Sequence, residues 1–239
     1  MKVDILAIGV HPDDVELGCS GTLLKHIAMG KNVGIIDLTQ GELGTRGSAK
    51  LRLEESENSR QIMGAVAREN LGMADGFFQH TKENVLKLSH VIRKYRPEIV
   101  LANAVRDRHP DHGRASKLIS DACFYSGLAK IEQQDESGAL LVPWRPKSVY
   151  HYIQDRNIKA DFVVDITPYM DKKMECILAF KSQFFTGDES GPQTPISGKA
   201  FMDFMKSKNQ CYARDIGAEF AEGFTVERTI GVNNLFDLI

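Results

Sequence analysis

"VDILAIGV" (residues 3–10), followed directly by "HPDDVELGCSG" (residues 11–21), decides the fold of this chain. The first segment is an apolar run rich in branched residues, as is typical of a buried strand. The second opens as a turn and continues into residues 17–30, where apolar side chains recur at helical spacing up to Gly30, a common helix terminator. A strand, a loop and a helix in this order form the repeating unit of a parallel sheet.

The same alternation continues along the chain and predicts one α/β domain over residues 1–239. Polar, glycine-containing stretches at residues 40–48 and 186–198 are expected to be loops, and residues 218–239 a tail. Further strands are expected at residues 32–39, 98–105, 148–155 and 161–167, and further helices at residues 49–67, 84–97, 168–184 and 199–217.

Charge and hydropathy exclude several classes of protein. Lys and Arg number 30 against 32 Asp and Glu, so no global field would attract nucleic acid or an anionic membrane. No apolar run approaches the roughly 18 residues of a membrane span, and the opening run is too short for a signal peptide. The four cysteines form no C-x-x-C pair, which argues against a thiolate zinc site. We therefore expect a cytoplasmic protein without nucleic-acid or membrane partners.

Two polar motifs follow two expected strands: "HPDD" after residues 3–10 and "HPDH" after residues 98–105. Loops at the carboxyl ends of parallel strands converge, so both motifs could line one pocket. Alone, "HPDD" is better explained as a helix-capping turn, and "HPDH" is explained equally well by a turn or a site. Their joint occurrence favours a divalent metal such as zinc, bound by nitrogen and oxygen ligands. Spacing alone does not divide the six candidates between metal ligation and acid-base work. They are His11, Asp13, Asp14, His109, Asp111 and His112.

These motifs resemble the signature of the zinc-dependent N-deacetylases of the LmbE/PIG-L type. The resemblance is strongest to the bacillithiol-biosynthesis branch, because further segments also resemble that branch: "GELGTRG", "ENLGMADGFF", "YRPEIVLAN", "DRHPDHGRAS" and "EFAEGFTVER". The resemblance implies a Rossmann-like, three-layer α/β domain with a mostly parallel sheet.

It also implies a role for each motif residue. His11, Asp14 and His112 would bind the metal, which is Zn²⁺ or, since this ligand set tolerates it, Fe²⁺. Asp13 would act as general base. His109 would stabilise the oxyanion and protonate the leaving amine, while Asp111 would orient His109.

The branch further implies a substrate, N-acetylglucosaminyl malate, and a homo-oligomer, often a hexamer. Arg52 and Arg108 would bind the malate carboxylates, and Asp75 would accept hydrogen bonds from sugar hydroxyls unless it only forms a turn. The alternative substrate is another N-acetylglucosamine conjugate or a chitooligosaccharide. A binding module without turnover is disfavoured by Asp13 and the His109–Asp111 pair, and a nucleotide-binding domain by the lack of G-x-G-x-x-G after the first strand.

Overall fold

A computed structural model describes residues 1–184 and 191–239, so part of the loop expected at residues 186–198 lies outside the described residues. The strands are β1 (Ile5–Gly9), β2 (Val33–Thr39), β3 (Ala67–Met73), β4 (Ile99–Ala102), β5 (Ser148–Tyr152), β6 (Phe162–Asp165) and β7 (Ala221–Val226). The α-helices are α1 (Asp14–Ala28), α2 (Ala49–Met63), α3 (Lys82–Tyr95), α4 (Pro110–Tyr125), α5 (Met170–Leu178) and α6 (Lys199–Ala213). None of the described helices is long and apolar enough to cross a membrane.

The strands form one sheet in the order β3-β2-β1-β4-β5-β7-β6. Strands β3, β2, β1, β4 and β5 run parallel to one another, whereas β7 is antiparallel to both β5 and β6. The predicted α/β fold with a mostly parallel sheet is therefore confirmed.

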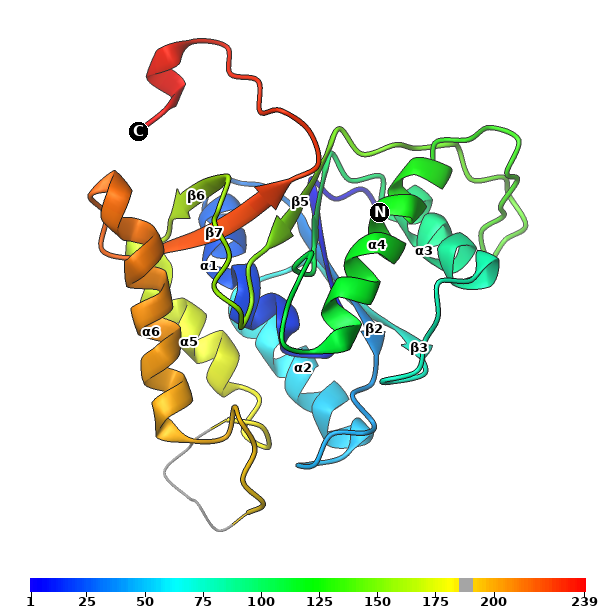
Figure 1. Cartoon of the computed structure of the whole chain (residues 1–239). Helices are drawn as coiled ribbons and strands as arrows, with labels where there is room; N and C mark the ends of the chain where they lie inside the picture. Colours follow the sequence, from blue (N-terminus) through cyan, green and yellow to red (C-terminus); the bar gives the residue numbers. More distant parts are fainter. Residues whose placement is uncertain (185–190) are drawn as a thin grey trace.

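Helices cover both faces of this sheet and give it three layers (Figure 1). Successive side chains of a strand point to opposite faces. In β1, Leu6 and Ile8 belong to the core cluster that includes residues of α3 and α4, while Ile5 and Ala7 belong to the cluster with α1. All four side chains are buried, which explains why the β1 sequence is a continuous apolar run.

Two strands were not expected from the sequence. The helix predicted over residues 49–67 ends earlier, at Gly64, which adopts a left-handed φ of 85°, and β3 starts at Ala67. Most side chains of β3 are only half-buried, because it lies at the edge of the sheet. Strand β7 lies inside the expected tail. It contains Glu222, whose buried carboxylate pairs with Lys173 at 2.6 Å. In the sequence, this charged residue looks like a surface residue.

Close packing against α1 fixes the loop that precedes it. A Cβ atom on Gly18 would lie 2.2 Å from the ring of Tyr152, so the helix approaches β5 more closely than a larger residue would allow. The Tyr152 hydroxyl donates a hydrogen bond of 3.0 Å to the carbonyl of Ile8 in β1. Helix α1 and strands β1 and β5 are therefore held together just behind the "HPDD" loop.

Candidate metal and catalytic site

The two polar motifs lie next to each other because β1 pairs directly with β4. "HPDD" connects β1 to α1, and "HPDH" forms the start of α4 after β4. Both border a cavity of about 320 Å³ at the carboxyl ends of the parallel strands. The sequence-predicted residues that line it are His11, Asp13, Asp14, Arg52, Asp75, Arg108, His109 and His112.

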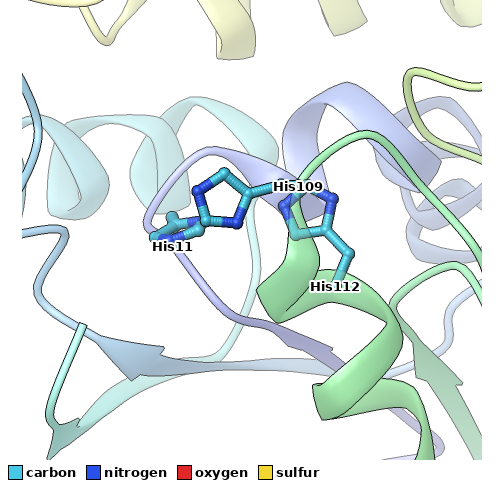
Figure 2. Close-up of side chains that lie close together, drawn as sticks. All are labelled: His11, His109 and His112. Carbon is cyan, nitrogen blue, oxygen red and sulfur yellow. The ribbon is translucent and has the colours of Figure 1, made fainter. Parts of the chain in front are cut away.

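Three histidines meet in this cavity, as Figure 2 shows. Their rings come from the loop after β1 and from the start of α4. Each of His11, His109 and His112 offers a nitrogen, and these atoms lie within 4.8 Å of one another. The ring centroids of His11 and His109 are 4.7 Å apart, and those of His109 and His112 are 5.1 Å apart. This spacing suits a small cation with imidazole ligands.

Asp14 is held in place through one carboxylate oxygen. Its Oδ2 accepts hydrogen bonds from the backbone N–H groups of Val10, at 2.9 Å, and His11, at 3.0 Å. The side-chain amide of Asn103 donates to the same oxygen at 3.0 Å. These donors leave Oδ2 little capacity for a metal.

The other oxygen of Asp14 faces the second motif. Oδ1 lies 3.2 Å from Nε2 of His112 and accepts one hydrogen bond, of 3.1 Å, from Nε2 of Gln154. Asp14 can thus present Oδ1 as a ligand atom beside His112.

His112 is oriented from its far side. Its Nδ1 contacts Oδ2 of Asp107 at 2.5 Å, and Oδ1 of Asp107 accepts from the backbone N–H of Arg156 at 2.7 Å. A carboxylate on one imidazole nitrogen fixes the tautomer and directs the other nitrogen to a metal. Burial lowers the pKa of His112, but the carboxylates of Asp14 and Asp107 outweigh it and raise the pKa to about 9.

His11 has the same kind of surroundings. Its Nε2 lies 2.9 Å from Oδ1 of Asp75, and its Nδ1 lies 3.6 Å from Oδ2 of Asp14. Burial alone would lower the pKa of His11, yet the contacts with Asp14 and Asp75 raise it to about 10. The carboxylates around these imidazoles therefore favour positive charge, and the set of nitrogen and oxygen donors fits a divalent cation.

Asp13 occupies a strained position at the start of α1, with a φ of 136°. One nitrogen, Nη2 of Arg52, holds it by donating to Oδ2 of Asp13 at 2.6 Å and to the carbonyl of Pro12 at 2.7 Å. Burial raises the pKa of Asp13 to about 7 against the opposing charge of Arg52. A carboxylate with this pKa is matched to proton transfer near neutral pH.

His109 and Asp111 are joined by a hydrogen bond from the backbone of Asp111, not from its carboxylate. The N–H of Asp111 donates to Nδ1 of His109 at 3.3 Å, which caps α4. The Asp111 carboxylate instead accepts from the N–H of Gly76 at 2.9 Å and from Nη1 of Arg114 at 2.7 Å. Asp111 is fully buried and ties α4 to the loop after β3. Burial, together with the charges of His11 and His112, lowers the pKa of His109.

The residues predicted to bind substrate are all engaged with protein partners. Arg52 is buried against Asp13, and Arg108, whose side chain is 46% exposed, pairs through Nε with Asp155. Asp75 contacts His11 and accepts from the N–H of Leu43 at 3.0 Å.

Asn103, Asp107 and Gln154 also belong to this site but were not singled out from the sequence. Asn103 and Gln154 follow the ends of β4 and β5, so each is a polar residue at the carboxyl end of a parallel strand. This position at a strand end could have marked both residues as members of the site. Asp107 lies within "DRHPDH", five residues before His112, and only the fold shows that its carboxylate turns back to the ring.

The family model described as GlcNAc-PI de-N-acetylase, PIG-L, matches residues 6–123, a region that contains both motifs. The diacetylchitobiose deacetylase of Thermococcus kodakarensis is 31% identical over 194 residues, which cover 75% of this chain and 70% of that protein. A crystal structure of a conserved protein from Thermus thermophilus superposes with a TM-score of 0.84 at 33% identity, covering 97% of this chain and 98% of that one.

A more distant relative has another activity. The 4-oxalmesaconate hydratase of Pseudomonas putida is 24% identical over 237 residues, covering 90% of this chain and 88% of that protein. The deacetylase similarity is higher and includes the family model that contains both motifs. This chain belongs to the PIG-L family, and it is a hydrolytic N-deacetylase.

Proposed function

We propose that this N-deacetylase removes the acetyl group from N-acetylglucosaminyl malate, as a step of bacillithiol biosynthesis in the cytoplasm. One observation carries the choice of substrate: Arg52 and Arg108 line the cavity that also contains His11, Asp14 and His112. A substrate with two carboxylates needs local cations when the whole chain has a net charge of -2. The resemblance of the sequence to the bacillithiol branch supports the same choice.

We assign the metal to His11, Asp14 and His112. Zinc held there supplies Lewis acidity for amide hydrolysis, and ferrous iron suits the same donors. Oδ1 of Asp14 and Nε2 of His112 supply adjacent ligand atoms, while Asp107 and Asn103 keep both side chains in place.

The remaining residues move protons. Asp13 accepts a proton from the water that attacks the acetyl carbonyl carbon. His109 stabilises the oxyanion and then protonates the amine as the C–N bond breaks, releasing acetate. Asp111 positions His109 through its own backbone N–H and by anchoring the start of α4. Asp75 holds His11 and lines the cavity, where it would accept a hydrogen bond from a sugar hydroxyl.

Acetate release from three substrates tests this proposal. The zinc-loaded protein is assayed with N-acetylglucosaminyl malate, the neutral methyl glycoside of N-acetylglucosamine, and diacetylchitobiose, and bound metal is determined by elemental analysis. We expect the malate conjugate to have the highest kcat/KM. A preference for diacetylchitobiose would favour the alternative of a chitooligosaccharide deacetylase, and no acetate from any of the three would overturn the proposal.

We also propose that the protein assembles with further copies of itself, as a hexamer. The segment after β7 runs away from the sheet (Figure 1) and exposes large apolar side chains, including Leu235 at 80%, Phe236 at 96% and Ile239 at 86%. Such a segment is expected to be covered by another chain. Light scattering should give a hexamer for the full chain and a smaller species after deletion of residues 232–239. A monomeric full chain would contradict the proposal.

A further inference from the structure

Lys208 of α6 is a buried lysine in the wall of the active-site cavity, and it is 7% exposed. Its Nζ donates to the carbonyl of Gln154 at 2.8 Å and, more weakly, to that of Ile153 at 3.4 Å. Within residues 1–184 and 191–239, no carboxylate lies within the 4.0 Å of an ion pair with it. Buried charges are normally paired, so a lysine without a carboxylate partner beside a cavity requires an explanation.

The neighbouring buried lysine shows the usual arrangement. Lys173 is fully buried and pairs with Glu222 at 2.6 Å. Its ammonium also donates to the carbonyls of Glu16 and Leu17, at 3.0 Å and 2.9 Å, so all three hydrogens have acceptors. Among the described residues, Lys208 has only carbonyl acceptors, and one of its two contacts is long.

The carboxylates that act on Lys208 from a distance are already paired. Asp155 contacts Arg108, and Asp107 contacts His112 and the N–H of Arg156. Burial lowers the pKa of Lys208 to about 7, and the positive charge of Lys173 acts in the same direction. A carboxylate brought by a ligand would supply the missing partner and stabilise the charged form of Lys208.

A second cationic side chain, that of Arg108, contacts the residue next to Gln154. Lys208 contacts the carbonyl of Gln154, and Arg108 pairs through Nε with Asp155, the next residue. In the part of the chain that is described, the terminal nitrogens of Arg108 donate no hydrogen bond. Both side chains line the cavity, where Lys208 is buried and Arg108 is exposed.

We infer that Lys208 is a specificity-determining residue that binds a carboxylate of the group attached to the amino sugar, with Arg108 as the second cation of this anion subsite. The inference rests on the proposed deacetylase function and deepens it, since it states which side of the cavity receives the anionic part. A lysine and an arginine that contact adjacent residues, Gln154 and Asp155, distinguish an anionic conjugate from a neutral one. The sugar and its acetamide are then directed toward His11, His109 and His112.

The inference is tested by a variant that removes the charge of Lys208 but keeps its hydrogen bond. Lys208→Gln keeps an N–H donor for the Gln154 carbonyl, and Lys208→Met serves if that variant does not fold. We compare kcat/KM for N-acetylglucosaminyl malate and for the neutral methyl glycoside. The expected result is a ratio of malate to neutral activity lowered by about ten- to a hundredfold, mainly through KM. Lys206→Met, at an exposed lysine of the same helix, is the matched control and should leave this ratio unchanged.

The outcomes separate the two proposals. Equal losses on both substrates would mean that Lys208 only supports residues 153–155, which overturns the subsite while the deacetylase function stands. A wild-type protein without preference for the anionic conjugate would also overturn it. A wild-type protein that releases acetate from neither substrate would overturn the proposed function and the subsite with it.

Discussion

Nε2 of His112 lies 3.2 Å from Oδ1 of Asp14, and each residue is held from behind by a partner of its own. Asp107 contacts the other nitrogen of His112, and Asn103 donates to the other oxygen of Asp14. The two proposed ligand atoms, which come from different strand ends, are thus held next to each other by the protein itself. Preorganisation of this kind makes metal affinity depend on the supporting residues as well as on the ligands.

Removing a ligand should remove the metal. We expect His112→Ala to purify with far less than one equivalent of zinc and to lose nearly all turnover, because the variant lacks the Nε2 that lies beside Oδ1 of Asp14. Elemental analysis and an acetate-release assay measure both effects. His80→Ala, which changes a surface histidine paired with Asp121, is the control and should keep metal and activity. Full zinc content in His112→Ala would exclude His112 as a ligand.

Weakening a supporting residue should have a smaller effect. Asp107→Asn keeps the size of the side chain but removes the charge that holds Nδ1 of His112. We expect the Kd for zinc to rise by roughly 10–100-fold, while the fold is kept. Competition with a chelator gives the Kd. Asp121→Asn on the surface of α4 is the control, and an unchanged Kd in Asp107→Asn would show that its contact with His112 does not support the metal.

The general base should be separable from the metal. Asp13→Asn retains an oxygen that can accept from Arg52, so the strained turn is expected to keep its shape. We expect kcat to fall by about 10²–10⁴-fold with unchanged zinc content, because proton transfer is lost and ligation is not. Metal analysis and steady-state kinetics on the same preparation test this. A variant with near-normal kcat would rule out Asp13 as the base.

The sequence predicts the place of the site well because that place depends on topology. "HPDD" and "HPDH" each follow an apolar strand, and neighbouring parallel strands bring such loops together regardless of side-chain detail. The contacts of Arg52 and Asp111 could not be predicted in this way. Arg52 turns to Asp13, and the Asp111 carboxylate turns to Gly76, because of packing between distant segments.

The missed strands have a related cause. Glu222 makes β7 look like part of a polar tail, yet the carboxylate is buried, where it accepts from Lys173 and from the N–H groups of Gly21 and Thr22. A buried ion pair has the same sequence signal as two surface charges, and only the tertiary structure distinguishes them. Lys208 was overlooked for a related reason, because a buried lysine cannot be told from a surface lysine in the sequence.

Close packing behind the site gives a prediction on stability. In Gly18→Ala the new Cβ would overlap the ring of Tyr152, which is fully buried and cannot move freely. We expect the free energy of unfolding in urea to fall by about 1–3 kcal/mol. Gly231→Ala is the matched control, since nothing lies within 4 Å of its Cβ, and it should change stability by less than about 0.5 kcal/mol. Equal stability of the two variants would contradict this packing argument.

The buried position of Lys208 predicts how stability depends on pH. Burial lowers its pKa to about 7 in the folded protein, whereas an unfolded chain has the ordinary lysine pKa of about 10.4. Between these values the unfolded state binds one more proton than the folded state, so this group makes the free energy of unfolding rise with pH. The charged groups that act on Lys208 are Lys173, Glu222, Asp107 and Asp155.

Lys208→Met should remove this contribution to the pH dependence. The free energy of unfolding of the wild type minus that of Lys208→Met is expected to increase from pH 7 to pH 9.5, by at most about 1.4 kcal/mol per pH unit, and to be flat below pH 6. Urea unfolding of both proteins at four or five pH values measures the difference. Lys206→Met, exposed on the same helix, should follow the wild type throughout. A difference independent of pH would mean that Lys208 keeps its proton in the folded protein, and that the hydrogen bonds to Ile153 and Gln154 stabilise the charged ammonium without a carboxylate.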